Sequence, residues 1–307
     1  MKPAQEPGHG APGTSAANRA TNVPKSAAPG KVSAAFQLPL TAYRPTGAEY
    51  TRIEEAKADL TRQCMEGLGF TGFQPAPVQS LGPGRDGADA MEDLDDLRYG
   101  TYDSTQAANN GYKPEFVVNR TNAFVDHPAP PDRSPDEWLA LTGTKKERSD
   151  APQSGLAAPR LKSGATVPYG GCIYQSLQKV TGGKPVIADL VINLSGQSFK
   201  SSLEDRRVKG AFADWSSCMK SKGYSYTDPM KANDDPKFSA KNATAAEIET
   251  AKADVACKNK VDLIKTWNSV DVEIQKRLIQ EHSAELYQIK QDKDSALKIA
   301  ASVNSRD

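Results

Sequence analysis

The chain contains four cysteines, Cys64, Cys172, Cys218 and Cys257, and their spacing limits the chemistry open to them. A zinc site usually has pairs of ligands about two to four residues apart, and no two of these cysteines are that close. A redox C-x-x-C motif is also absent. The spacing therefore favours structural disulfides, and four cysteines allow three connectivities.

A catalytic cysteine would need a histidine partner, and the chain has three histidines: His9, His127 and His282. His9 lies in the N-terminal tail, and His282 lies beside Glu281 in a helical pattern. His127 is the only loop histidine that could do chemistry. These positions favour disulfide-bonded over nucleophilic cysteines.

Carboxylates form the other candidate for chemistry. The acidic cluster comprises Glu92, Asp93, Asp95 and Asp96. Their spacing does not match a calcium-binding EF-hand loop, so we interpret the cluster as a solvated acidic loop. Glycine-rich segments at 82–87 and 182–184 lack the Gly-Lys-Ser/Thr of a phosphate-binding loop. We predict no catalytic, cofactor-binding or metal-binding residues and no cofactor.

Two of the cysteines begin a repeated motif. Residues 64–70 read C-M-E-G-L-G-F and residues 218–224 read C-M-K-S-K-G-Y, each at the end of an amphipathic pattern that a glycine terminates. Each motif has one later cysteine available, and we propose the pairs Cys64–Cys172 and Cys218–Cys257. Each bridge would staple a motif helix to a following helix. Such bonds persist outside a reducing cytosol, so they favour an exported protein.

Composition and charge exclude some classes of function. Lys and Arg number 39 against 38 for Asp and Glu, a net charge of +1, whereas a nucleic-acid binder usually shows a basic stripe. No apolar run approaches the roughly 18 residues that span a bilayer. Residues 1–45 are rich in Pro, Ala and Gly and predict a disordered tether. We expect a targeting segment, missing from this chain, to supply any membrane contact through a removed N-terminal anchor.

Residues 46–307 predict a mainly α, disulfide-stapled helical domain with long irregular loops, above all at 75–168. A loose duplication would divide it at 183/184. Within the loop, Ser134 and Pro135 resemble a helix start. The apolar residues from Ile187 to Leu194 fit either a helix or a buried strand.

The C-terminal stretch has neither Gly nor Pro after Pro236 and opens on a capping box formed by Thr244 and Glu247. Unbroken, residues 245–303 would form a helix of about 90 Å. Because that exceeds a domain's diameter, we expect a long C-terminal helix that projects as a coiled-coil arm, or a helical hairpin.

Three sequence elements together resemble a known family. They are the C-M-x-x-x-G-aromatic motif, a D-x-R-V…W-x-x-C-M-x-x-x-G-Y-x-Y…P stretch at 205–229, and an A-x-A-D-V-x-C-K helix at 251–258. This combination is similar to uncharacterised secreted proteins and predicted lipoproteins of actinobacteria. The resemblance covers about residues 46–300 and implies export, disulfides and a helical fold, but it brings no established activity or site residues. The chain lacks the signal sequence and lipid-attachment motif of that family.

Three functional hypotheses are compatible with these features. The first is a non-enzymatic cell-envelope binding or scaffold protein, secreted or held at the outer face of the membrane, whose partner is another envelope protein or a transporter. Its long C-terminal stretch could dock against a partner helix. The second is an extracellular hydrolase or carbohydrate-active enzyme that uses acidic residues such as Asp93 and Asp96. The third is a small-molecule binding protein with residues 75–168 as a lid.

Overall fold

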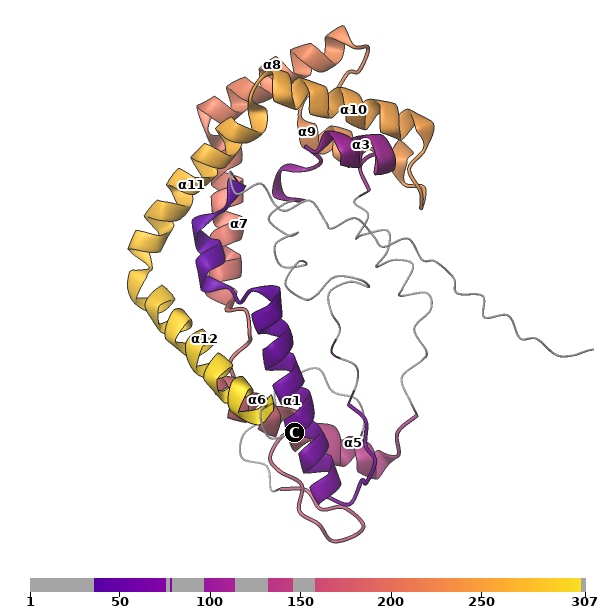
Figure 1. Ribbon diagram of the computed structural model, residues 1–307, viewed down its shortest axis with the longest axis vertical. Coiled ribbons are helices and arrows are strands. Elements are labelled where there is room, and N and C mark those ends of the chain that lie inside the picture. Colours follow the sequence, from indigo (N-terminus) through magenta and orange to yellow (C-terminus); the bar gives the residue numbers. More distant parts are fainter. Residues whose placement is uncertain (1–35, 76–77, 79–96, 114–131, 146–157, 305–307) are drawn as a thin grey trace, which may run out of the picture. The chain divides into compact units, whose positions relative to one another are not determined.

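The computed structural model describes residues 36–75, 78, 97–113, 132–145 and 158–304 (Figure 1). All of them belong to one compact unit, residues 32–307, and the predicted tether up to residue 35 lies outside the described residues. The described part is mainly helical, as predicted, and its only β pairing is an isolated bridge between Arg160 and Thr166. None of its helices is both long and apolar enough to cross a membrane.

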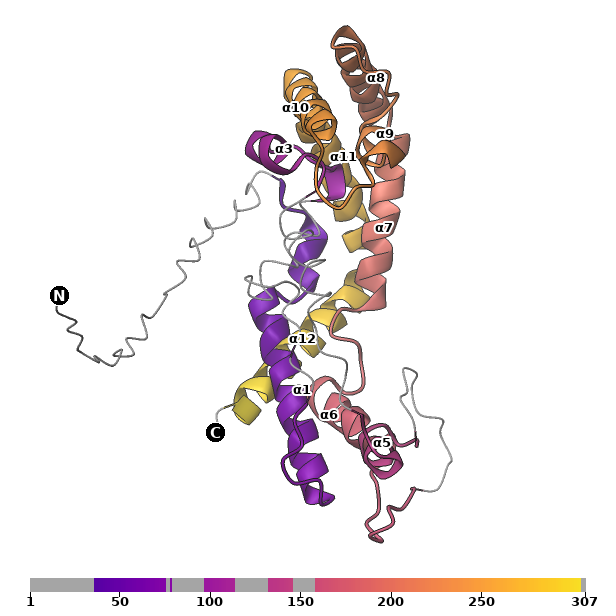
Figure 2. The ribbon, with the colours of Figure 1, turned by 90° about the vertical axis from the view of Figure 1, so that its right-hand side faces the viewer.

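Four helices form one group, which contains the first disulfide: α1 (Gly47–Gly67), α5 (Pro135–Thr142), α6 (Gly171–Thr181) and α12 (Ser283–Asn304). Helix α1 begins at a complete capping box, in which Thr46 and Glu49 each satisfy a backbone N–H of the other. Its buried face carries Ile53 and Ala56, which pack against α12 and α6, and Met65, which packs against α5 and α6. The first and last helices of the described chain are therefore neighbours (Figure 2).

A second group of helices packs around the other disulfide: α3 (Ser104–Asn110), α8 (Arg206–Ser221), α9 (Pro229–Asn233) and α10 (Ala245–Lys260). Two short 3-10 helices, η3 (Leu97–Tyr99) and η4 (Pro236–Phe238), add Tyr99 and Phe238 to the same core. Helices α7 (Asp189–Glu204) and α11 (Leu263–Glu281) pack along each other and both contact α8. Trp215 and Trp267, both fully buried, fill the centre of this core.

The two C-M-x-x-x-G-aromatic motifs fold alike. In each motif the backbone N–H of the aromatic residue donates to the methionine carbonyl, Phe70 to Met65 and Tyr224 to Met219, both at 3.0 Å. The glycine before each aromatic has a positive φ, 97° at position 69 and 89° at position 223. Left-handed glycines of this kind close helix C-termini. The repeated sequence is thus a repeated helix end.

The stretch after Pro236 is helical, as predicted, but divides into three helices, α10, α11 and α12. The first break falls at Val261 and Asp262. Asp262 has φ 50° and is the only described non-glycine residue with a positive φ. The second break falls at His282, which ends α11. Helix α10 and the first half of α11 bury their apolar faces in the core around Trp215 and Trp267, whereas α12 reaches the clusters around Leu40 and Ile53. One straight helix of this length could not reach all three.

Ordered structure begins ahead of the predicted domain start at residue 46. A short 3-10 helix, η2 (Pro39–Tyr43), contacts α7, α11 and α12. Its Leu40 is 2% exposed, and the Leu40 N–H donates to Gln275 Oε1 on α11 at 3.0 Å. Residues 36–45, assigned to the tether from composition, are therefore part of the folded body.

The described parts of the irregular segment 75–168 contain two α-helices besides the 3-10 helix η3. One is α5, which starts as predicted with Ser134 as its cap and Pro135 in its first turn. The other, α3, is short and was not predicted. Its N-cap Asp103 accepts from the Gln106 N–H, and its Ala107 is completely buried against α10. The ambiguous residues 187–194 enter α7 and are helical rather than a strand from Asp189 on.

Candidate functional site

The four cysteines are joined in the proposed pairs. Cys64 near the end of α1 bonds to Cys172 at the start of α6, and Cys218 on α8 bonds to Cys257 on α10. The Cα atoms of each pair are 5.7 Å apart, a normal separation for a disulfide. No free cysteine is left. The bonds indicate a non-reducing environment for the folded chain.

An arginine–aspartate pair connects η3 to α11 inside the protein. The Arg98 guanidinium donates to both carboxylate oxygens of Asp271, at 2.5 and 3.1 Å, and also to Ser195 and Ser198 on α7. Tyr99 donates its hydroxyl to the same carboxylate at 3.1 Å. Burial and the Asp271 charge raise the pKa of Tyr99 well above its usual range, so this phenol stays protonated and acts as a donor.

A second buried ion pair lies on α10, where Asp254 and Lys258 are one turn apart along the helix. Lys258 Nζ lies 3.0 Å from Asp254 Oδ2, and neither side chain is exposed. Trp215 Nε1 on α8 donates to the other oxygen of Asp254 at 2.9 Å, while Lys258 also donates to the Thr101 carbonyl at 2.7 Å. Burial raises the pKa of Asp254, and Lys258 opposes that rise.

A third buried carboxylate, Glu247, holds the residues after α3. It accepts from the Tyr112 backbone N–H at 3.1 Å and from the Lys113 ammonium. Lys113 also donates to the Phe238 carbonyl at 2.7 Å. Each of these three carboxylates therefore joins α10 or α11 to a segment distant in sequence. Their geometry suits a framework, since every oxygen is occupied by a protein donor.

The aromatic residues near residue 100 belong to this core. Tyr99 is 1% exposed and its ring lies 5.0 Å from that of Trp267, while Tyr112 is 7% exposed and packs on Phe238. These two side chains pack against the helices of the core rather than line a groove. The acidic cluster at 92–96, His127 and His9 lie outside the described residues. His282 ends α11, with Nδ1 3.5 Å from the Glu285 carboxylate.

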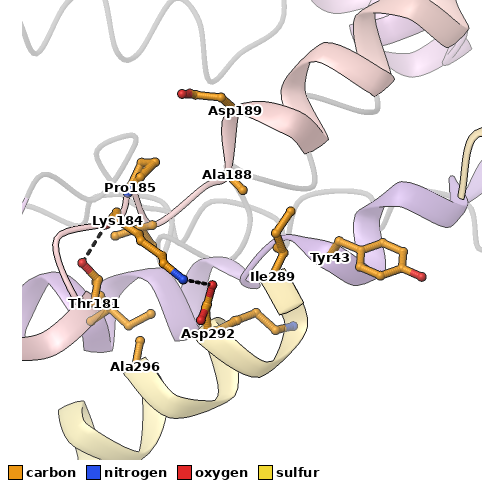
Figure 3. A pocket seen from close by; sticks show the side chains of 12 residues that line it. Tyr43, Thr181, Lys184, Pro185, Ala188, Asp189, Ile289, Asp292 and Ala296 are labelled. Carbon is orange, nitrogen blue, oxygen red and sulfur yellow. Dashed lines mark hydrogen bonds and ion pairs between the residues drawn. The ribbon is translucent and has the colours of Figure 1, made fainter. Parts of the chain in front are cut away.

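The candidate binding site is a pocket of about 220 Å³ bordered by η2, α1, the α6–α7 connection and α12 (Figure 3). It lies where two core clusters meet. Its lining includes Ile53, Val186 and Ala296 from one cluster and Tyr43, Ala188 and Ile289 from the other. Sequence reasoning missed this pocket, because its lining comes from segments more than 200 residues apart.

Two lysines and two aspartates, together with Thr181 and Pro185, complete the pocket's lining. Lys184 extends across it to Asp292, with Nζ 2.5 Å from Oδ2 (Figure 3). The Lys184 ammonium holds the pKa of Asp292 below its usual value, so this pair is charged. Lys293 is 15% exposed, and its ammonium lies 3.4–4.0 Å from the Ala42 and Arg44 carbonyls and the Glu49 carboxylate.

The fold and its bonds define a disulfide-stapled helical protein of a non-reducing compartment. Comparison of the chain with protein-family models, with curated proteins and with solved structures finds no match. The described residues contain no group of three or more His, Cys, Asp or Glu side chains that could hold a metal ion.

Proposed function

We propose that this chain is a non-enzymatic binding or scaffold protein that works outside the cytoplasm, as a secreted or membrane-anchored component of a cell envelope. Its partner is another envelope protein or a transporter. The observation that carries the proposal is the use of the buried charges: Asp254, Asp271 and Glu247 each connect separate segments. These connections make the folded chain rigid, and a rigid body can present a fixed binding surface to a partner.

The disulfides support a location outside the cytoplasm. Both bridges join two helices, and reducing conditions would open them. The resemblance to secreted proteins and predicted lipoproteins of actinobacteria points the same way, toward export followed by anchoring. A direct measurement is alkylation of intact cells: the cysteines should resist a thiol reagent until the protein is denatured and reduced.

The apolar faces of the C-terminal helices are buried against other helices of the same chain. Helix α11 packs on α7 and α8, and α12 packs on α1 and α6. Leu286, Ala296 and Ala300 of α12 are at most 4% exposed. A partner helix could therefore not take these faces without unfolding the protein. We expect the partner to contact side chains that the fold leaves exposed.

Five large apolar side chains of the described residues are exposed, and two of them are close in sequence at the start of α6. Tyr169 is 41% exposed and Ile173 is 46% exposed, while the Tyr169 ring packs edge-on against Tyr174 at 5.6 Å. Exposed aromatic and aliphatic side chains are common contacts at interfaces. Ile192 on α7, 54% exposed, is an independent position.

Site-specific photo-crosslinking in the source cells tests the proposal. A photoreactive residue at position 173 or 192 should give one discrete adduct with an envelope protein. The matched control places the same residue at Lys179, which is exposed on another face of α6. Equal adducts at all three positions, or none at any of them, would contradict a specific partner surface near α6 and α7.

A hydrolase using the acidic cluster is a separate hypothesis whose residues lie outside the described part of the chain. Turnover of cell-wall and glycan substrates by the intact chain, abolished in an Asp93/Asp96 double variant, would favour it over the scaffold. Small-molecule binding is favoured by one specific observation, the pocket between η2 and α12.

A further inference from the structure

We infer that the pocket between η2, α1, the α6–α7 connection and α12 binds a small amphipathic carboxylate, a short acyl chain with one anionic head. This inference goes beyond partner binding and does not depend on it. Three features carry it: an incompletely coordinated ammonium, the uncapped start of a helix, and an apolar lining of matching size.

The ammonium of Lys293 provides the anionic head with a partner. Its contacts, at 3.4 Å to the Arg44 carbonyl, 3.5 Å to the Ala42 carbonyl and 4.0 Å to the Glu49 carboxylate, are all long. Charge-assisted hydrogen bonds in proteins usually measure about 2.7–2.9 Å. Glu49 is turned to its capping box, where it accepts from the Thr46 N–H at 2.8 Å. A ligand carboxylate could give Lys293 the short contact that the protein does not.

The start of α7 adds positive potential on the same pocket. Ala188 precedes the helix without a side-chain cap, and its carbonyl accepts from the Val191 and Ile192 N–H groups, so only the N–H groups of Asp189 and Leu190 lack an acceptor among the described residues. Free N–H groups at a helix start favour anions. The two carboxylates of the pocket lining, Asp292 and Asp189, do not offset this positive potential equally. Asp292 is held by Lys184 and Gln288, and Asp189 is drawn pointing away from the other labelled side chains (Figure 3).

The apolar lining fits a short chain. Ile53 and Ala296 are buried at 1% and 4% exposure, and Ile289 and Val186 are half-buried. A volume of about 220 Å³ equals that of roughly seven water molecules at ~30 Å³ each. Hexanoate, with six carbons and two oxygens, is of this size. Larger ligands, such as drug-sized molecules, usually occupy about 300–1,000 Å³.

Titration of the oxidised full-length chain near neutral pH tests the inference, with four probes at equal ionic strength: butanoate, hexanoate, hexan-1-ol and hexylammonium. We expect saturable binding of hexanoate, at least about tenfold tighter than that of hexan-1-ol or hexylammonium, because only the carboxylate pairs with Lys293. Hexanoate should also bind roughly fifteenfold tighter than butanoate, since it has two more methylenes and each buried methylene contributes ~0.8 kcal/mol, about fourfold. Methyl NMR shifts at Ile53, Ile289 and Ala296 locate the site.

Two variants and a control separate the head from the tail. Lys293→Met keeps the apolar stem of the side chain and should remove the preference for hexanoate over hexan-1-ol. Ala188→Leu narrows the pocket and should weaken both ligands by at least about tenfold. The control Lys290→Met alters an exposed lysine on the same helix and should leave both affinities unchanged.

Three outcomes would overturn the inference: hexan-1-ol or hexylammonium binding as tightly as hexanoate, shifts confined to methyl groups outside the pocket, or unchanged hexanoate affinity in Ala188→Leu. Because two of these need only the wild-type chain, the test stands even if Lys293→Met fails to fold. Failure here would leave the photo-crosslinking result untouched, so the two proposals are distinguished.

Discussion

Asp254 and Lys258 show what single buried charges contribute to this protein. Each has a partner on another segment, Trp215 for Asp254 and the Thr101 carbonyl for Lys258, in addition to their mutual contact. Taking two charges out of water costs several kcal/mol, and only complete hydrogen bonding repays it. The pair therefore specifies how α10 sits against α8 and the segment before α3, rather than adding much net stability.

Removing only one partner of this pair should be strongly destabilising. We expect Lys258→Met to lower the free energy of unfolding by about 3–5 kcal/mol, because Asp254 is left as an unpaired buried charge. Chemical denaturation of the oxidised chain measures it. In the double variant Asp254→Asn/Lys258→Met no charge is buried and the amide oxygen can still accept from Trp215. That variant should regain part of the loss.

The Lys258→Met variant should also gain a pH dependence. Burial raises the pKa of Asp254 above 3.8 in the folded chain, and loss of Lys258 raises that pKa further. A raised folded pKa means that the folded state binds the proton more readily than the unfolded state. The variant's free energy of unfolding should therefore increase as the pH falls toward 3.8 and decrease as it rises. The same loss at every pH would contradict this assignment.

Asp235, on the surface, shows the opposite shift. The Tyr226 hydroxyl donates to it at 2.7 Å, and this bond, with the Lys237 contacts, lowers the pKa of Asp235 to about 2. Tyr226→Phe should move the pKa back toward 3.8, because the largest cause of the shift is lost. Carboxyl-carbon NMR titration measures it, with Tyr224→Phe as the control. An unchanged pKa in Tyr226→Phe would contradict the role of the hydroxyl.

At the scale of elements, one close approach fixes how α5 meets α6. A Cβ at Gly171 would lie 2.5 Å from both the Gly143 nitrogen and the Leu141 carbonyl oxygen, and the residue has φ 76°. Only glycine fits there without displacing backbone. The contact also sets Cys172, the next residue, at the start of α6, where Cys64 reaches it.

A pair of glycine substitutions separates the cost of the positive φ from the cost of the backbone clash. Gly69 also has a positive φ, 97°, but nothing lies within 4 Å of a Cβ built on it. Gly69→Ala should therefore cost only the conformational strain, about 1–2 kcal/mol. Gly171→Ala adds a backbone clash and should cost at least ~3 kcal/mol in total. Urea denaturation of the oxidised proteins measures both, and equal losses would show that the clash is relieved freely.

Long, strongly patterned elements were accessible from the sequence, and those set by tertiary contacts were not. The Thr244 cap of α10 and the Ser134–Pro135 start of α5 are local signals, and both helices begin there. The reciprocal half of the predicted capping box does not form, because Glu247 accepts from Tyr112 and Lys113 instead. Helix α3 has seven residues and one buried side chain, so its sequence carries no helical period. The break at Asp262 occurs without a glycine or a proline. It is imposed by packing of α10 and α11 on different neighbours, which no local pattern reports.

The same distinction holds for the sites. The disulfide pairs followed from a repeated motif whose two copies fold alike. The pocket could not be predicted from the sequence, because its walls come from η2, α1 and α12 and meet only in the folded chain. The buried aspartates were equally invisible, since Asp254 and Asp271 look like solvated positions on amphipathic helices. Their partners Trp215 and Arg98 are 39 and 173 residues away.

On the scale of the whole molecule, each disulfide joins helices within one of two groups. Cys64–Cys172 ties α1 to α6, and Cys218–Cys257 ties α8 to α10. Helices α7 and α11 pack on each other and reach α8, while η2 contacts both of them and α12. Besides the backbone itself, the connection between the groups depends on packing and on polar contacts such as Leu40 to Gln275, without a disulfide between them.

Removing each bridge by double Cys→Ala substitution should reveal this division. On the loop-entropy model, the 108-residue separation of Cys64 and Cys172 contributes ~5 kcal/mol and the 39-residue separation of Cys218 and Cys257 ~4 kcal/mol. The first variant should therefore lose more free energy of unfolding. Amide hydrogen exchange should rise mainly in α1, α5 and α6 for that variant and mainly in α8 and α10 for the other. Uniform loss of protection over the chain in both variants would show instead that the two groups unfold as one cooperative unit.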